Sequence, residues 1–110
     1  METLVKGDII VARYPFSDLS SSKKRPAIVV AALENLDPIV CPITSSFRDD
    51  VYSIAIGEDD LQEGCLKYES LIKTTSLLTL ERSLILYKVG CLKEPKVREV
   101  EEKLVEIFTR

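Results

Sequence analysis

One stretch decides the fold, namely Ser20-Ser21-Ser22-Lys23-Lys24-Arg25-Pro26-Ala27-Ile28-Val29-Val30. It joins a polar loop with three consecutive cations to an apolar run that extends to residue 32, which is typical of a strand buried on both faces. Pro26 stiffens the junction and favours an extended backbone at Arg25. Cations tethered to a rigid strand suit a phosphate-binding site. The alternative interpretation is a solvated hairpin loop whose charges only keep the protein soluble.

Runs of β-branched and aromatic residues on both sides of this stretch predict further strands. The predicted strands cover residues 9–14, 27–32, 39–45, 51–56, 69–75 and 83–89, where Gly90 ends the last one. Pro42 predicts an edge strand or a bulge for the third. We expect a solvated acidic turn over residues 58–64 and one helical turn over residues 77–82. Apolar side chains at helical spacing from Pro95 onward predict an amphipathic helix packed on the sheet, with a partner-binding helix as the alternative.

Length and composition favour one small domain. The 110 residues, 45% of them hydrophobic and 30% charged, suit a single domain over residues 1–110. Short strands followed by one helix predict a mainly β fold, a strongly bent antiparallel sheet or barrel. Such a sheet leaves edges and one face uncovered, so we predict a homodimer. No apolar run approaches the roughly 20 residues that span a bilayer, and residues 1–6 lack the form of a signal peptide, so we expect a cytoplasmic protein.

Charge and residue usage narrow the chemistry. The net charge of −3 argues against broad duplex binding, but a local basic patch can still bind a short nucleic-acid segment. The chain has no histidine, which removes the usual general base and the commonest transition-metal ligand. Cys41, Cys65 and Cys91 form no Cys-x-x-Cys pair, so we predict no metal site and interpret all three as small apolar fillers.

Several motifs together resemble one protein family. They are Gly7–Ile10, Pro15–Ser20, Lys24–Val30, Ile43–Ser45, Ser70–Lys73, Leu77–Leu80 and Gly90–Leu92. In this order they are similar to the PemK/MazF toxin family over essentially the whole chain. The resemblance implies a homodimeric, SH3-like antiparallel β-barrel of the PemK/MazF/CcdB toxin type. It also implies a sequence-specific endoribonuclease that cuts single-stranded mRNA without a metal or other cofactor, and an antitoxin with an acidic, disordered tail that restrains it.

Carried over position by position, the family's catalytic pair falls on Arg25 and Thr44. Attack of a 2′-hydroxyl on the adjacent phosphate builds negative charge on the phosphorane oxygens, and an arginine fork can bind two of them. A threonine hydroxyl can donate to a third oxygen or position the nucleophile. An arginine is a poor general base, because its guanidinium does not lose its proton in proteins. We therefore assign Arg25 to phosphate stabilisation.

Other residues are candidates for RNA contact. We expect Lys23, Lys24, Arg48 and Lys73 to contact phosphates, Ser45 to lie in the same RNA-binding surface, and Phe16 and Phe47 to stack on unpaired bases. The two phenylalanines are chosen because each lies in a polar loop.

The chain departs from the family pattern at three places. Ser21 and Ser22 stand where relatives often carry a glycine. Thr75 stands where they often carry an acidic residue, and Leu78 where they often carry an arginine. These departures bear on cleavage specificity and rate.

Three other functions remain open from the sequence. One is an inactive RNA-binding or regulatory module of the same fold. Another is a gyrase inhibitor of the CcdB type, and the resemblance implies that this activity relies on a C-terminal Trp-Gly-Ile tail. This chain ends Ile107-Phe108-Thr109-Arg110 instead. The last is an interaction domain with no nucleic-acid role.

Overall fold

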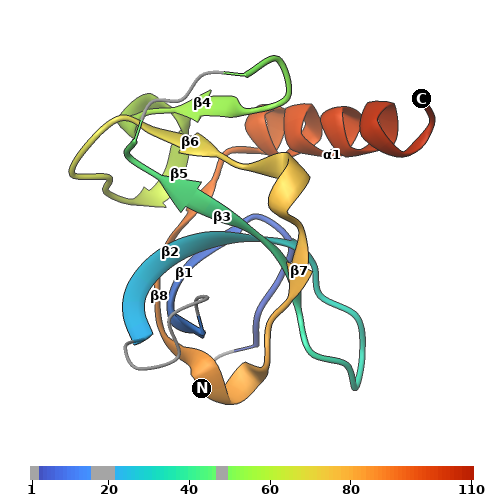
Figure 1. The fold of residues 1–110 in the computed structure, drawn as a ribbon. Coiled ribbons are helices and arrows are strands. Elements are labelled where there is room, and N and C mark those ends of the chain that lie inside the picture. Colours follow the sequence, from blue (N-terminus) through green and yellow to red (C-terminus); the bar gives the residue numbers. More distant parts are fainter. Residues whose placement is uncertain (1–2, 16–21, 47–49) are drawn as a thin grey trace.

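A computed structural model describes residues 3–15, 22–46 and 50–110 (Figure 1). Within these residues the strands are β1 (Asp8–Pro15), β2 (Ser22–Ala31), β3 (Ile39–Thr44), β4 (Ile54–Ile56), β5 (Leu61–Gly64), β6 (Ser70–Ile72), β7 (Leu78–Thr79) and β8 (Ile85–Leu92). The helices are the 3-10 turns η1 (Glu58–Asp60), η2 (Thr74–Ser76) and η3 (Arg82–Leu84), and the α-helix α1 (Glu94–Phe108). The prediction of a mainly β fold with a C-terminal helix is confirmed.

The strands form one antiparallel sheet that bends into a half-barrel. Its order is β4-β6-β3-β2-β1-β8-β5, and β7 also pairs with β3. The longest ladder joins β1 to β2 in unbroken register from Ile9↔Ile28 to Pro15↔Ser22. In Figure 1, β1, β2, β3, β7 and β8 curve around the lower part of the molecule, while β4 and β6 lie beside α1 above them.

Two apolar clusters lie on opposite faces of the central strands. Ala27 and Val29 of β2 belong to a cluster with Ile85 of β8. Ile28, between them in sequence, belongs to a second cluster that includes Val100 of α1. Successive side chains of a strand point to opposite faces, so the continuous apolar run of β2 reflects burial on both faces, as the sequence predicts.

The C-terminal helix packs on the sheet through one apolar stripe. Pro95 lies in its first turn, where the missing N–H costs nothing. Val100 belongs to the second cluster, and Val97 and Leu104 pack against it. The predicted amphipathic helix is therefore confirmed in its packing role.

The second strand begins earlier than the sequence predicts. Lys23, Lys24 and Arg25 lie in β2 and pair with residues of β1, for example Ala12↔Arg25. The prediction of a polar loop here was wrong, because cross-strand pairing with β1 outweighs the weak strand preference of consecutive lysines. The cations therefore project from a fixed ladder.

Pro42 marks neither an edge strand nor a bulge, contrary to the prediction. It lies in β3, which pairs with β2 on one side and with β7 and β6 on the other. The backbone N–H of Lys73 donates to the Pro42 carbonyl at 2.8 Å, so the missing N–H of Pro42 faces the same side. There β7 pairs with Ile39 and Val40, and β6 pairs with Ile43 and Thr44. Pro42 thus falls between two partner strands, where the ladder needs no donor from it.

Three other local predictions were wrong. Residues 61–64 form β5 rather than a turn, because they pair with β8. Leu78 pairs with Val40 in β7 instead of starting a helical turn, and the 3-10 turns lie at 74–76 and 82–84. The last strand continues through Gly90 to Leu92. Each of these elements is set by a partner distant in sequence, which local propensity does not register.

Gly90 occupies a close crossing between β5 and β8. A Cβ added there would lie 2.2 Å from the backbone oxygen of Glu63, which leaves no room for a side chain without moving backbone. We expect Gly90→Ala to lower the free energy of unfolding by about 1–3 kcal/mol, measured by urea denaturation at a fixed protein concentration.

Gly57→Ala is the matched control for this experiment. A Cβ at Gly57 meets nothing nearer than Glu69 Cγ at 3.8 Å, so its effect should stay within about 0.5 kcal/mol. Equal stability of the two variants would show that the crossing is not tightly packed.

Candidate functional site

The candidate site lies where β2 and β3 separate. Their ladder runs from Ala31↔Ile39 to Ala27↔Pro42, and beyond it Ile43 and Thr44 pair with β6 instead. A hollow of about 360 Å³ opens in this fork, and we call it the basic hollow. Its lining is Lys23, Lys24, Arg25, Pro26, Ile43, Thr44, Ser45, Leu66, Lys67, Tyr68 and Ser70.

The basic hollow brings both predicted catalytic residues together. Arg25 and Thr44 each lie two residues beyond the last pair of the ladder, Ala27↔Pro42. Side chains two residues apart on a strand point to the same face, so both leave their strands on one face of the fork. Lys23, Lys24 and Ser45, which were predicted to contact RNA, also line the hollow.

The Thr44 hydroxyl is held in place by the backbone of its own turn. Its Oγ1 accepts a hydrogen bond of 3.1 Å from the backbone N–H of Ser46, and its side chain is half-buried. A hydroxyl can accept and donate at the same time. Thr44 can therefore keep this orientation while donating to an oxygen bound in the hollow.

The charged side chains that line the basic hollow are all positive. It includes the exposed side chains of Lys23, Lys24, Arg25 and Lys67, and none of the described residues that line it has a carboxylate. A concave surface with cations of one sign attracts anions. The chain as a whole carries −3, so this patch is a local exception.

Sequence reasoning missed the wall supplied by the connection between β5 and β6. Leu66, Lys67 and Tyr68 line the hollow from this connection, and Ser70 lines it from the start of β6. Tyr68 is 64% exposed, and Lys67 Nζ lies 5.8 Å from the centre of its ring. An aromatic residue in a polar connection was the available signal, and it is the criterion that selected Phe16 and Phe47.

The remaining predicted contacts are not in the lining. Lys73 lies outside it, and its Nζ is 2.8 Å from Asp50 Oδ2. Phe16, Phe47 and Arg48 fall outside the described residues.

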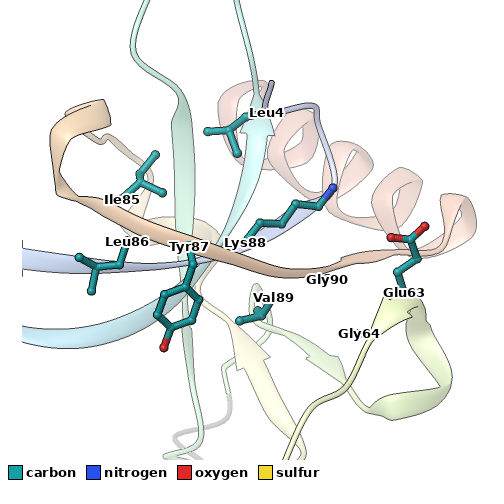
Figure 2. Close-up of a pocket in the computed structure, with 9 residues that line it drawn as sticks. All are labelled: Leu4, Glu63, Gly64, Ile85, Leu86, Tyr87, Lys88, Val89 and Gly90. Carbon is teal, nitrogen blue, oxygen red and sulfur yellow. The ribbon is translucent and has the colours of Figure 1, made fainter. Parts of the chain in front are cut away.

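A separate hollow of about 640 Å³ runs along β8 (Figure 2). It is lined by Leu4, Glu63, Gly64, Ile85, Leu86, Tyr87, Lys88, Val89 and Gly90. Lys88 Nζ is 3.1 Å from the buried Asp8 Oδ1, so this cation balances a carboxylate of the fold. The hollow contains none of the predicted site residues, and the basic hollow remains the candidate site despite its smaller volume.

The cysteines are free thiols in different surroundings. Cys41 is buried, and burial raises the pKa of its thiol to about 12, so it stays protonated and serves as an apolar filler. Cys65 is exposed, so the filler interpretation was wrong for that residue. In the described part of the chain, no group of three or more histidine, cysteine, aspartate or glutamate side chains is placed to hold a metal ion.

Comparison with known proteins gives one family match and a set of structural relatives that includes the two described below. The model of the family described as PemK-like, MazF-like toxin of type II toxin-antitoxin system matches residues 5–108. No curated protein sequence matches the chain. None of the described helices combines the length and apolar character needed to cross a membrane.

Both structural relatives share the fold over nearly their full length. The structure of Mycobacterium tuberculosis toxin MazF-mt6 has a TM-score of 0.73 and 17% identity, and covers 93% of this chain and 96% of its own. An endoribonuclease in complex with its cognate antitoxin from a mycobacterial species has a TM-score of 0.73 and 12% identity, with coverage of 99% and 96%. At these identities the likeness establishes the fold alone.

The ion pair of Lys73 and Asp50 should affect the pKa of the Asp50 carboxyl. Lys73, with the backbone N–H groups of Tyr52 and Ser53, holds the pKa of the Asp50 carboxyl well below its ordinary value of 3.8. In Lys73→Met we expect this pKa to rise, while staying below the ordinary value because the N–H donors remain. NMR titration of the Asp50 side-chain carbon measures it.

The sign of the pH dependence follows from the lowered pKa. The interaction stabilises the fold above the ordinary pKa and is lost as pH falls through the lowered one. Lys67→Met, which removes a cation elsewhere, should leave the Asp50 titration unchanged. An Asp50 pKa that does not move in Lys73→Met would show that the backbone donors alone set it.

Proposed function

The chain belongs to the family of PemK-like, MazF-like toxins of type II toxin–antitoxin systems, and from that premise we propose that it is a sequence-specific endoribonuclease acting on single-stranded mRNA. The observation that supports this most is the convergence of Arg25 and Thr44 in the basic hollow. Unpaired RNA exposes its phosphates and bases to a site of this kind.

The proposed reaction is internal transfer at one phosphate. The 2′-oxygen attacks the adjacent phosphorus, so that the 2′-O–P bond forms and the P–O5′ bond breaks. The 2′-hydroxyl loses its proton and the departing 5′-oxygen gains one, which leaves a 2′,3′-cyclic phosphate and a 5′-hydroxyl. Negative charge grows on the non-bridging oxygens during this step.

The residues of the hollow have distinct roles in that step. The Arg25 fork binds two non-bridging oxygens and stabilises the added charge as it develops. The Thr44 hydroxyl donates to one of these two oxygens or orients the 2′-hydroxyl. Lys23 and Lys24 contact neighbouring phosphates and hold the strand in register.

The partner that restrains this activity is an antitoxin with an acidic, disordered tail. Such a tail carries the same sign of charge as RNA, and it orders on binding to a complementary surface. Bound over the basic hollow, its carboxylates would occupy the positions of the phosphates. The proposal draws on the family match and on the charge of the lining.

The decisive test removes the guanidinium. We expect Arg25→Ala to lose at least about 100-fold in cleavage rate, because one charge-stabilising group in such a site typically contributes that much. The substrate is mixed-sequence single-stranded RNA in the presence of EDTA, and the products are analysed for cut position and for 2′,3′-cyclic phosphate ends.

Arg98→Ala is the matched control, because that arginine is exposed on α1 and pairs with Glu94. It should cleave like the wild type. Wild-type protein that binds RNA without cutting it would favour the inactive RNA-binding module, and full activity of a folded Arg25→Ala variant would refute the assigned role.

We also propose that the protein works as a homodimer. The sheet order ends in β4 and β5, and Leu86 and Tyr87 expose apolar surface on β8. Pairing of two copies is a common way to cover edges and faces of a small sheet. Light scattering at micromolar concentration should give twice the 12.4 kDa of one chain, whereas the mass of a single chain would contradict the proposal.

A further inference from the structure

We infer that Tyr68 stacks on an unpaired base of the RNA strand whose phosphate is bound at Arg25, an inference that rests on the proposed function. Tyr68 thereby becomes a positioning residue of the site. Nothing in the sequence motifs points to it, because it lies between β5 and β6 and outside every stretch that carries the family resemblance.

Exposure and position single out this ring. Among the side chains whose exposure the structure describes, the large aromatic ones left exposed are those of Tyr68, Tyr87 and Phe108, and Tyr68 is 64% exposed. Of these three, Tyr68 lines the basic hollow beside Arg25 and Thr44. An exposed ring at the wall of a cationic groove is the arrangement by which proteins bind single strands without pairing to them.

The neighbouring lysine fixes which face of the ring is open to a base. Lys67 Nζ lies over the ring of Tyr68 at 5.8 Å from its centre, a distance within the range of a cation–π contact. That contact occupies one face of the ring. A base therefore stacks on the opposite face, while Lys67, which also lines the hollow, adds to the charge that holds the strand.

Charge on the far side of Tyr68 determines which part of a nucleotide can reach it. Tyr68 also borders a second hollow, of about 710 Å³, which we call the acidic hollow. Its lining is Ala55, Ile56, Gly57, Glu58, Asp59, Asp60, Leu66, Lys67, Tyr68, Glu69 and Ser70. This lining carries four carboxylates against one cation, so its net negative charge repels a phosphate.

The charges of the two hollows thus determine where the phosphate and the base of a nucleotide bind. The phosphate stays with Lys23, Lys24 and Arg25, where the lining is cationic. The base carries no charge, so it can extend past that lining and lie against Tyr68 at the boundary. Stacking makes use of the π-face that every base has, so Tyr68 contributes affinity and placement for any base.

The test compares RNA with and without bases. The first probe is a mixed-sequence 2′-O-methyl RNA, which lacks the nucleophile and is not cut. The second is an abasic oligonucleotide of the same length and charge. Fluorescence anisotropy at one fixed salt concentration gives the dissociation constant of each, because phosphate binding depends steeply on salt.

We expect Tyr68→Ala to weaken binding of the base-bearing probe by about 5-fold to 100-fold, the loss typical of one stacked base. Its affinity for the abasic probe should equal that of the wild type. Tyr68→Phe keeps the ring and should bind both probes normally. Phe108→Ala removes an exposed ring of α1 that does not line the basic hollow and should also bind both probes normally.

The outcomes separate this inference from the proposed function. Wild-type protein that binds neither probe would overturn the proposed function, and this inference with it. Wild-type binding to RNA with an unchanged Tyr68→Ala variant would overturn the stacking role alone. An equal loss on both probes would also overturn it, since the substitution would then act on the phosphate site rather than on a base.

Discussion

The ion pair between the buried carboxylate of Asp8 and Lys88 is the interaction on which the arrangement of the sheet depends. Asp8 is 1% exposed, and burial of a charge is costly unless a partner compensates it. Lys88 of β8 supplies that partner at 3.1 Å. The preceding Gly7 donates to the carbonyl of Val29 at 2.8 Å and accepts from the N–H of Leu92 at 2.9 Å. One turn thus fixes the start of β1 against both β2 and β8, and its φ of +98° at Gly7 favours glycine.

The position of the site follows from that turn. The register that begins at Ile9↔Ile28 continues without a shift to Ala12↔Arg25. A slip of one residue would move every side chain of β2 to the opposite face, taking Arg25 away from Thr44. The register shifts among the described strands lie instead between β1 and β8, between β2 and β3, and between β5 and β8. The ladder that carries the cations is therefore the regular one, which makes the basic hollow a property of the sheet.

Features of the fold that depend on neighbouring residues could be predicted from the sequence, whereas features that depend on residues distant in the chain could not. The apolar run of β2 and the helix from Pro95 onward are visible in local patterns, because burial imposes a period on neighbouring residues. The strand β5, the place of Pro42 between two partner strands, and the wall containing Tyr68 depend on segments distant in the chain. The prediction that Arg25 and Thr44 act together depends on the family resemblance, since a lone threonine on a strand carries no signal. Lys73 illustrates the same limit, because only the fold shows that it pairs with Asp50.

On the proposed function, the distribution of charge explains how an acidic protein can act on a polyanion. A net charge of −3 gives RNA no long-range attraction, and contacts beyond the Debye length are screened in any case. Binding then depends on a few phosphates entering the basic hollow at short range. A duplex presents its phosphates on a stiff, regular path, whereas a single strand can bend one phosphate into the fork and turn its base outward. On the proposed function, the restricted basic patch therefore selects single strands, and an acidic peptide can compete because it must match only the same small patch.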